Sequence, residues 1–298
     1  EREMRADTYQ RVTDQVIAEL ENGAAPWVKP WSVPAGMSIA EPHNFKSGRK
    51  YRGINVLMLW LSACAGGYAS PAFLTFKQAK EAGGNVRKGE KGHKVVFFKE
   101  LEVDDESAPD GTRKVPMLRE YTVFNVDQCD GIEAPAMPAE AVTTVIGNDS
   151  PFDRLIAASG AQIRHLGDKA FYQPAADRIQ MPAPLLFDAH ASYQAVLLHE
   201  LTHWTGHVDR LNRDFSGRFG SQAYAAEELV AELGAAFLCA HLGIVGELRH
   251  AGYIESWLRL LKSDKRAIFT AAAKAQKAAD FIIEKAEAAE AVRTPLAA

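Results

Sequence analysis

Three histidines and a glutamate lie close together in the segment VLLHELTHWTGH, whose other residues are mostly apolar. His199 and His203 are four residues apart, so on a helix both imidazoles lie on one face, one turn apart. Two neutral imidazoles at this separation can bind one zinc ion, each at about 2.0–2.1 Å. Glu200 follows the first histidine, and its carboxylate can act as general base toward a water on the open side of the metal. The spacing therefore predicts a hydrolytic zinc site, with manganese as an alternative divalent cation.

A catalytic zinc site needs a third protein ligand and keeps a fourth position for water. Two candidates lie directly beyond the second histidine. Asp209 completes the pattern HExxHxxGxxD, in which Gly206 would turn the chain and return the aspartate to the metal. His207 continues the four-residue spacing and lies on the same face if the helix persists. Either residue could complete the ligand set.

A third candidate lies further along the chain, in the segment AEELVAELGAAF. Glu228 and Glu232 are four residues apart on this expected helix, so they face the same way. Unpaired carboxylates on so apolar a helix would be costly, which favours a role for both at the metal. We favour Glu228 as the third ligand, the gluzincin arrangement, with Glu232 hydrogen-bonded to a ligand imidazole. Glu227 and Glu232 remain less favoured ligands.

The elements that would position these residues can be read from hydrophobic periodicity. Helices are expected over 189–205 and 221–242, with one or two more after residue 253. Upstream, PFDRLIAASG predicts a short helix. The segment over 163–182 predicts a β-hairpin that turns at 174–177. The region that carries the histidines is therefore expected to be mainly helical, with a small antiparallel sheet.

The first part of the chain has a different pattern. Helices are expected over 7–23, 54–67 and 73–84, and the last two end at glycine pairs. The period then changes to that of strands over 94–103 and 118–126, with an acidic, turn-rich segment between them. This part is therefore expected to be an α+β domain, and the chain as a whole to have the α+β class.

Composition sets the broad class of the protein. The 298 residues are 47% hydrophobic and 24% charged, which is typical of globular proteins. A segment rich in alanine and proline over 131–150 predicts a linker between a domain over 1–130 and one over 151–298. The net charge of −4 gives no basic field over the whole chain.

Three cysteines, Cys64, Cys129 and Cys239, lie far apart and fit neither a disulfide framework nor a thiolate metal site. A reducing cytoplasm is the expected location. No apolar run reaches the ~18 residues that a membrane span requires, and the polar first residues do not read as a signal peptide. We therefore expect no membrane partner.

Basic side chains nevertheless gather in two segments of the first domain, NFKSGRKYRGIN and GGNVRKGEKGHKVVFFK. Cations of this kind neutralise phosphates, and aromatic faces stack on unpaired bases. The residues expected to bind single-stranded DNA are Lys46, Arg49, Lys50, Tyr51, Arg52, Arg87, Lys88 and Lys91. Together they predict a basic groove confined to the first domain.

The chain resembles the ArdC family of plasmid antirestriction proteins over nearly its whole length. The resemblance rests on YRGINVLMLW, FLTFKQAKEAGGNVRKGEKGHKVVFF and VFNVDQ, and later on FYQPAADRIQMP, HELTHWTGH and EELVAELGAAFL. It implies a single-stranded-DNA-binding domain, shared with TraC-type primases, and a zincin-like metallopeptidase domain similar to the SprT and Spartan type. In zincin folds the hairpin before the histidine helix supplies the edge strand that pairs with substrate.

The resemblance also implies that the protein protects incoming plasmid DNA from host restriction during conjugation. Whether the peptidase-like site is active is left open by the sequence. Two alternatives therefore stand beside antirestriction. One is a DNA-dependent zinc protease that cleaves a host protein, with a restriction component as one conceivable target. The other is a protein that only coats single-stranded DNA and whose metal is structural.

Overall fold

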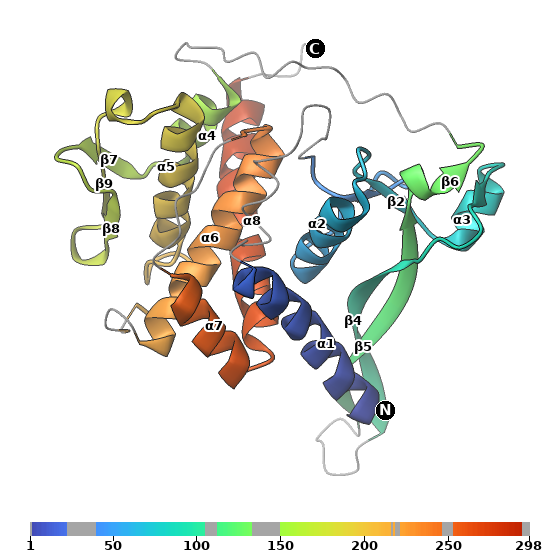
Figure 1. Ribbon diagram of the computed structural model, residues 1–298. Coiled ribbons are helices and arrows are strands. Elements are labelled where there is room, and N and C mark those ends of the chain that lie inside the picture. Colours follow the sequence, from blue (N-terminus) through green and yellow to red (C-terminus); the bar gives the residue numbers. More distant parts are fainter. Residues whose placement is uncertain are drawn as a thin grey trace. The chain divides into compact units, whose positions relative to one another are not determined.

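Figure 1 shows the computed structural model, which describes residues 2–22, 40–104, 112–132, 150–215, 217, 221–245 and 253–293. The chain divides into two compact units. The first comprises the described residues within Glu1–Thr8 and Pro42–Pro135, and the second those within Tyr9–Glu41 and Ala136–Ala298. The expected linker over 131–150 lies almost entirely outside the described residues.

The division differs from the expected boundary because most of α1 (Arg2–Glu21) belongs to the second unit. Its apolar stripe is buried, and its polar groups also find partners in that unit. The Tyr9 ring packs edge-on against Phe269 with 4.5 Å between ring centroids. Thr13 Oγ1 donates a hydrogen bond of 2.8 Å to the carbonyl oxygen of Lys265. Contacts between segments so far apart in the chain are not visible in local periodicity.

The first unit is built on a four-stranded sheet in the order β1-β2-β5-β4. Its strands are β1 (His43–Asn44), β2 (Ala72–Leu74), β4 (His93–Asp104) and β5 (Thr112–Asn125).

The long strands β4 and β5 are antiparallel. Helix α2 (Ile54–Gly66) carries Asn55, whose side-chain amide donates to the Val96 carbonyl and accepts from the Val96 N–H, each at 2.7 Å. This side chain satisfies backbone groups on the outer edge of β4, which would otherwise be open to another strand.

The segment expected to be one helix over 73–84 is instead a strand followed by a short helix. Residues 72–74 are fully buried in β2, and α3 (Phe76–Glu81) begins only after Thr75. Thr75 and Gln78 form a reciprocal capping box, which fixes the start of the helix at this point. A short buried apolar run cannot be assigned to helix or strand from periodicity alone, so this expectation was wrong in its first part.

Two short elements complete this unit. The helical turn η2 (Val126–Gln128) follows β5 directly. Strands β3 (Asn85–Val86) and β6 (Cys129–Asp130) then form a two-stranded antiparallel pair.

The second unit begins, after α1, with α4 (Pro151–Ser159) and a three-stranded sheet in the order β7-β9-β8. The strands are β7 (Gln162–His165), β8 (Phe171–Gln173) and β9 (Arg178–Met181).

The expected hairpin is confirmed for β8 and β9, which are antiparallel and joined by the turn η3 (Pro174–Ala176). Strand β7, however, is parallel to β9. The small sheet is therefore mixed rather than antiparallel throughout, because strand pairing depends on tertiary contacts rather than on each strand's own pattern.

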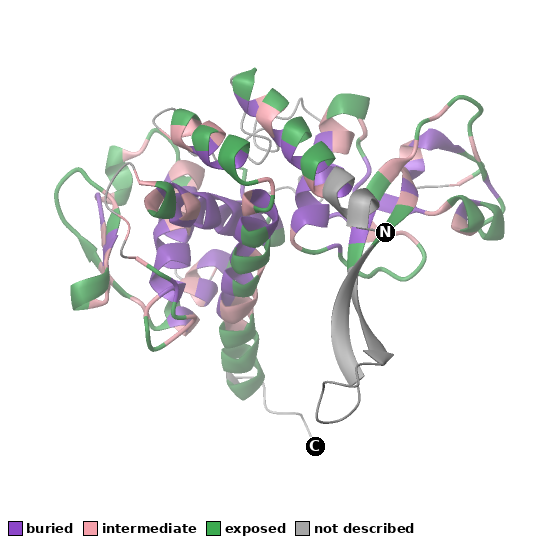
Figure 2. Cartoon of the chain, turned by 90° about the horizontal axis from the view of Figure 1, so that it is seen from below, coloured by how far each residue is buried: buried purple, intermediate pink, exposed green. Residues whose placement is uncertain are grey.

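Four helices form the core of this unit: α5 (His190–Thr205), α6 (Gln222–Leu242), α7 (Ile254–Ser263) and α8 (Ala267–Arg293). Helix α6 packs against the other three and is buried along most of its length, as the purple ribbon in Figure 2 shows.

Helices α5 and α6 approach closely because Gly234 faces Thr202. A Cβ atom at Gly234 would lie 2.4 Å from Thr202 Cγ2. Within the described part of the chain, no helix has the length and apolar character that crossing a membrane requires.

Candidate metal centre

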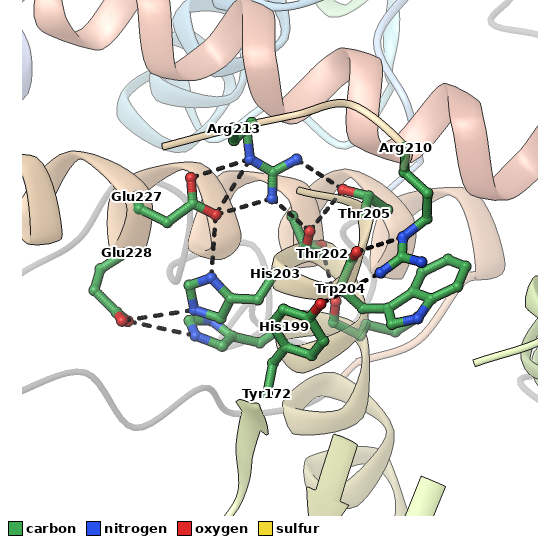
Figure 3. Close-up of polar contacts among 11 residues, drawn as sticks. Tyr172, His199, Thr202, His203, Trp204, Thr205, Arg210, Arg213, Glu227 and Glu228 are labelled. Atoms are coloured by element: carbon green, nitrogen blue, oxygen red, sulfur yellow. Dashed lines mark hydrogen bonds and ion pairs between the residues drawn. The ribbon is translucent and has the colours of Figure 1, made fainter. Parts of the chain in front are cut away.

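The two histidines of α5 and a glutamate of α6 converge on one point (Figure 3). His199 Nε2 lies 3.5 Å from Glu228 Oε2, and His203 Nε2 lies 3.6 Å from Glu228 Oε1. One ligand atom from each of the three residues lies within 4.8 Å of the others. These separations suit donors that surround a single divalent cation at about 2.0–2.2 Å.

The opposite nitrogen of each imidazole faces a different carboxylate of α6. His199 Nδ1 lies 3.2 Å from Glu232 Oε1, and His203 Nδ1 lies 3.2 Å from Glu227 Oε1. A carboxylate at Nδ1 favours the tautomer that leaves the Nε2 lone pair available to a metal. Glu232, expected from the sequence to bond a ligand imidazole, thus lies beside His199 Nδ1. It also gives Glu227 an equivalent position at the other histidine, which that interpretation missed.

Glu227 is held in turn by Arg213, which comes from the loop after α5 (Figure 3). Arg213 Nε and Nη2 donate to the Glu227 carboxylate at 3.0 and 2.9 Å. The same guanidinium donates to Thr205 Oγ1 at 2.8 Å and to the Thr202 carbonyl oxygen at 2.6 Å. Arg213, Glu227 and His203 thus form a continuous buried chain of hydrogen bonds that leads to the metal-binding nitrogen.

Gly206 allows this loop to pass close to the end of α5. Its N–H donates to the His203 carbonyl oxygen at 2.8 Å, and the helix ends here. A Cβ atom at Gly206 would lie 2.5 Å from the Phe215 ring and 2.9 Å from Arg213 Nη2. The side chains that follow the helix therefore occupy the space that a larger residue would take.

The other candidate ligands are not part of the cluster. His207 and Asp209 lie in the loop beyond Gly206, where His207 Nδ1 is 3.4 Å from Asp209 Oδ2. The Asp209 side chain is 81% exposed. Because the helix stops before His207, its side chain does not continue the face that carries the first two histidines.

Glu200 is buried next to the cluster and belongs to the same helix. Burial raises the pKa of its carboxyl, and the positive charges of His199 and His203 only partly oppose this effect. The backbone N–H of Tyr172, in strand β8, donates a hydrogen bond to this carboxylate. The residue expected to act as general base is thus tied to the strand at the edge of the small sheet.

Proton binding at the two histidines competes with metal binding. Burial alone would lower the pKa of His203, but its hydrogen bonds with Glu227 and Glu228 outweigh burial and raise this pKa to about 9. Burial likewise opposes protonation of His199, yet Glu232 and Glu228 raise its pKa well above the ordinary value. The same contacts hold the pKa of Glu228 far below its ordinary value, although its burial acts in the opposite direction.

The cluster opens into a cavity of ≈ 1080 Å³. Besides the ligand residues, aromatic side chains line it: Tyr172, Phe187, Phe215, Tyr224 and Tyr253. Such a cavity leaves room for a water and a substrate beside a three-ligand metal, whereas a structural zinc site is closed by four protein ligands.

The residues expected to bind DNA lie in the first unit, and the structure separates them into groups. Lys46 is paired with Glu81 at 2.6 Å, and Arg87 with Glu90 at 2.9 Å. The remaining basic residues of that set are exposed: Arg49, Lys50, Arg52, Lys88 and Lys91.

Tyr51 differs from the basic residues because it is only 9% exposed. Burial raises the pKa of its phenol, which is also hydrogen-bonded to Asn44. Its ring offers no free face to a base, so the burial argues against the stacking role expected for it.

Comparison with known proteins finds a matching domain family for each of the two parts of the chain. Residues 6–124 match the N-terminal domain of the anti-restriction factor ArdC, and residues 150–274 match a zincin-like metallopeptidase domain. The uncharacterized protein y4eC of Sinorhizobium fredii is 45% identical over 93% of this chain and 91% of its own length. The DNA primase TraC of Escherichia coli is 37% identical over 94% of this chain, which spans only 27% of that primase.

Solved structures agree with these matches. The metal-free crystal structure of antirestriction protein ArdC from plasmid R388 has a TM-score of 0.80 and 47% identity, over 95% of this chain and 98% of that one. Its Mn(II)-bound structure has a TM-score of 0.77 and 45% identity, over 93% and 97% of the two chains. Together with the His/His/Glu cluster, they identify a site for a divalent metal, zinc or manganese. By sequence and by structure, the chain belongs to the ArdC antirestriction family.

Proposed function

We propose that this protein binds single-stranded DNA through its first unit and protects incoming plasmid DNA from host restriction during conjugation. Its membership of a family described as antirestriction proteins supports the proposal. The relatives that are described as DNA primases support a role on DNA. The exposed basic residues of the first unit supply the cations that a DNA backbone requires.

The second unit is proposed to act as a zincin-like metallopeptidase. When bound, a divalent cation supplies Lewis-acid chemistry and makes water more acidic. His199, His203 and Glu228 would hold the cation, and Glu232 and Glu227 would orient the two imidazoles. Glu200 accepts a proton at its carboxylate as water attacks the peptide bond. The raised pKa of Glu200 suits a group that must take up a proton and then release it.

One observation carries the peptidase proposal. The three ligand atoms and Glu200 border the same cavity of ≈ 1080 Å³, so a peptide and a water can reach the cluster. A metal that served only to stabilise the fold would need no such access.

The test compares Glu200→Gln with a His199→Ala/His203→Ala variant. Each is assayed for metal content, for cleavage of unfolded protein substrates, and for transfer of unmodified plasmid DNA into a restricting host. We expect Glu200→Gln to keep one metal per chain and to lose peptide hydrolysis, and the double variant to lose the metal. One-to-one metal in a folded double variant would refute the site.

The plasmid-transfer assay separates the two alternatives. If Glu200→Gln still protects DNA, hydrolysis is not the mechanism, and DNA coating with a structural metal is favoured. If protection is lost together with hydrolysis, a protease that cleaves a host protein is favoured.

A further inference from the structure

The first unit carries an exposed aromatic ring beside the sheet. Phe76, the first residue of α3, is 53% exposed. Its ring meets that of Phe124 of β5 edge-on, with 6.4 Å between centroids. Lys80, one turn later on α3, places its Nζ 5.9 Å from the centre of the Phe76 ring. Helix α3 packs beside β3 and β5 (Figure 1), and this packing fixes the position of the Phe76 ring on the unit.

The basic loop before β4 packs against one ring of this pair, Phe124. Buried Gln128 donates from its Nε2 to the Lys91 carbonyl oxygen and to Glu90 Oε2, both at 3.0 Å. Gly92 lies so close to Phe124 that a Cβ atom there would be 3.0 Å from the ring. The backbone of Lys91 is therefore fixed next to Phe124 rather than free to move away.

A third lysine lies on the same face of the sheet. Lys94 and Thr122 are opposite each other in the β4–β5 register, and Lys94 Nζ donates to Thr122 Oγ1 at 2.8 Å. Side chains alternate between the two faces along a strand, so Phe124 shares the face of Thr122. We call Phe76, Phe124, Lys80, Lys91 and Lys94 the Phe76 patch.

The charges of the Phe76 patch are not neutralised locally. Lys80 donates to the Asn85 amide and Lys94 to a hydroxyl, both neutral partners. Among the residues that the structure describes, none of the three lysines forms an ion pair with a carboxylate, whereas nearby Glu81 is paired with Lys46 and Lys77. An exposed ring with one ammonium group beside it, and further lysines on the adjoining strand and loop, is complementary to a chain of bases and phosphates.

We propose that the Phe76 patch is a contact surface for single-stranded DNA, with a base stacked on Phe76 and the lysines at the adjacent phosphates. This inference rests on the proposed DNA-binding function. It assigns the stacking role to Phe76 instead of Tyr51. An unpaired strand fits better than a duplex, because only unpaired bases present a whole ring face to an aromatic side chain.

The opposite face of the sheet provides a matched control. Phe97 and Tyr121 are each 46% exposed, and their rings lie 5.4 Å apart. The alternation along the strands places them away from Lys94 and Phe124. They are thus exposed aromatic residues of the same unit that lie outside the patch.

The experiment uses the full chain and a fluorescein-labelled oligothymidine of about 15 nucleotides, within the range covered by common single-strand binding modules. Anisotropy titrations compare wild type with Phe76→Ala, Phe76→Leu, Phe76→Trp and the control Tyr121→Ala. We expect Phe76→Ala and Phe76→Leu to weaken binding by roughly 5- to 150-fold, the range that removal of one stacked base–aromatic pair produces. Phe76→Trp should retain affinity because it keeps an aromatic face, and Tyr121→Ala should bind like wild type.

A second series tests the lysines. Replacing Lys80 and Lys94 together by alanine should reduce the slope of log affinity against log salt by about 0.7 for each phosphate that is no longer neutralised. Phe76→Leu should leave this slope unchanged, because it removes no charge.

The outcomes separate the patch from the proposed function. If wild type does not bind the oligonucleotide, DNA binding by this chain fails and the patch fails with it. If wild type binds and Phe76→Ala behaves like Tyr121→Ala, DNA binding stands but the patch is refuted. A loss confined to Tyr121→Ala would place the strand on the opposite face of the sheet and would also refute the patch.

Discussion

Replacing Arg213 by methionine should weaken metal binding, although Arg213 is neither a candidate metal ligand nor one of the residues that line the cavity. Its side chain is only 4% exposed and gives most of its hydrogen bonds to Glu227, which holds His203 Nδ1 at 3.2 Å. Without the arginine, a buried carboxylate loses its cation and can turn away from the imidazole. Loss of such an orienting interaction typically lowers metal affinity by about 10–100-fold.

The same change also acts on stability. Removing one member of a buried ion pair typically destabilises a protein by about 3–5 kcal/mol, because the remaining charge is left uncompensated. The assay therefore combines two measurements: zinc affinity by competition with a chromogenic chelator, and the free energy of unfolding of the protein without added metal. Arg213→Lys serves as the milder variant if the methionine variant folds poorly.

Arg210 provides the matched control for this prediction. It lies in the same loop, donates to Asp177, to the Trp204 carbonyl oxygen and to the Tyr172 hydroxyl, and stacks on the Trp204 ring at 3.8 Å. It donates no hydrogen bond to Glu227, the carboxylate that faces His203. Arg210→Met should lower stability and leave zinc affinity within a few-fold of wild type. If both arginine variants lose affinity equally, or if Arg213→Met binds zinc like wild type, Arg213 does not act through the histidine and the reasoning is wrong.

Four further predictions concern the same site. Glu228→Ala should lose zinc binding severely, whereas Asp209→Asn should leave it nearly unchanged; chelator competition checks both, and the reverse result would make the aspartate the ligand. Zinc affinity should rise with pH up to about 9, because the raised pKa of His203 means that metal must displace a proton; calorimetry in buffers of different ionisation enthalpy should detect proton release at pH 7, and its absence would contradict the raised pKa. Without metal, the imidazolium's contribution to stability should be fully present below about pH 6.5, the ordinary histidine value, and be lost as pH rises through about 9, which chemical denaturation at several pH values can follow. Gly206→Ala should be destabilising by about 1–3 kcal/mol, since its methyl group would overlap the Phe215 ring; an unchanged melting temperature would show that the loop can move aside.

The sequence predicts the ligand helix and its neighbour well because their signals are local. The four-residue spacing of His199 and His203 fixes their common face, and the same spacing pairs Glu228 with Glu232. It could not decide the role of Glu227. Adjacent helical residues differ by about 100° in direction, so the rotation of α6 about its axis, set by packing against α5, determines which acids face the imidazoles.

Other features depend on contacts between distant segments. Nothing in the segment around Arg213 marks that arginine as a partner of Glu227, because loop geometry brings the two together. Tyr51 lies among basic residues and reads as exposed, yet its ring is buried. The Phe76 patch combines α3, β4, β5 and the loop before β4, so neither basic segment reveals it alone.

The charge balance of the second unit explains why so apolar a pair of helices carries this many acids. Glu200, Glu227, Glu228 and Glu232 are all buried there, with Arg213 as a permanent cation among them. Uncompensated buried carboxylates would be strongly destabilising. Without a metal, the raised pKa values of the two ligand histidines allow each imidazole to carry a proton, which adds two positive charges. A divalent cation that displaces both protons brings the same two charges back, so the cluster can exchange protons for metal without a change in its buried charge. The fold can therefore remain the same with and without the cation. The pH and the metal concentration determine whether the site holds two protons or the cation.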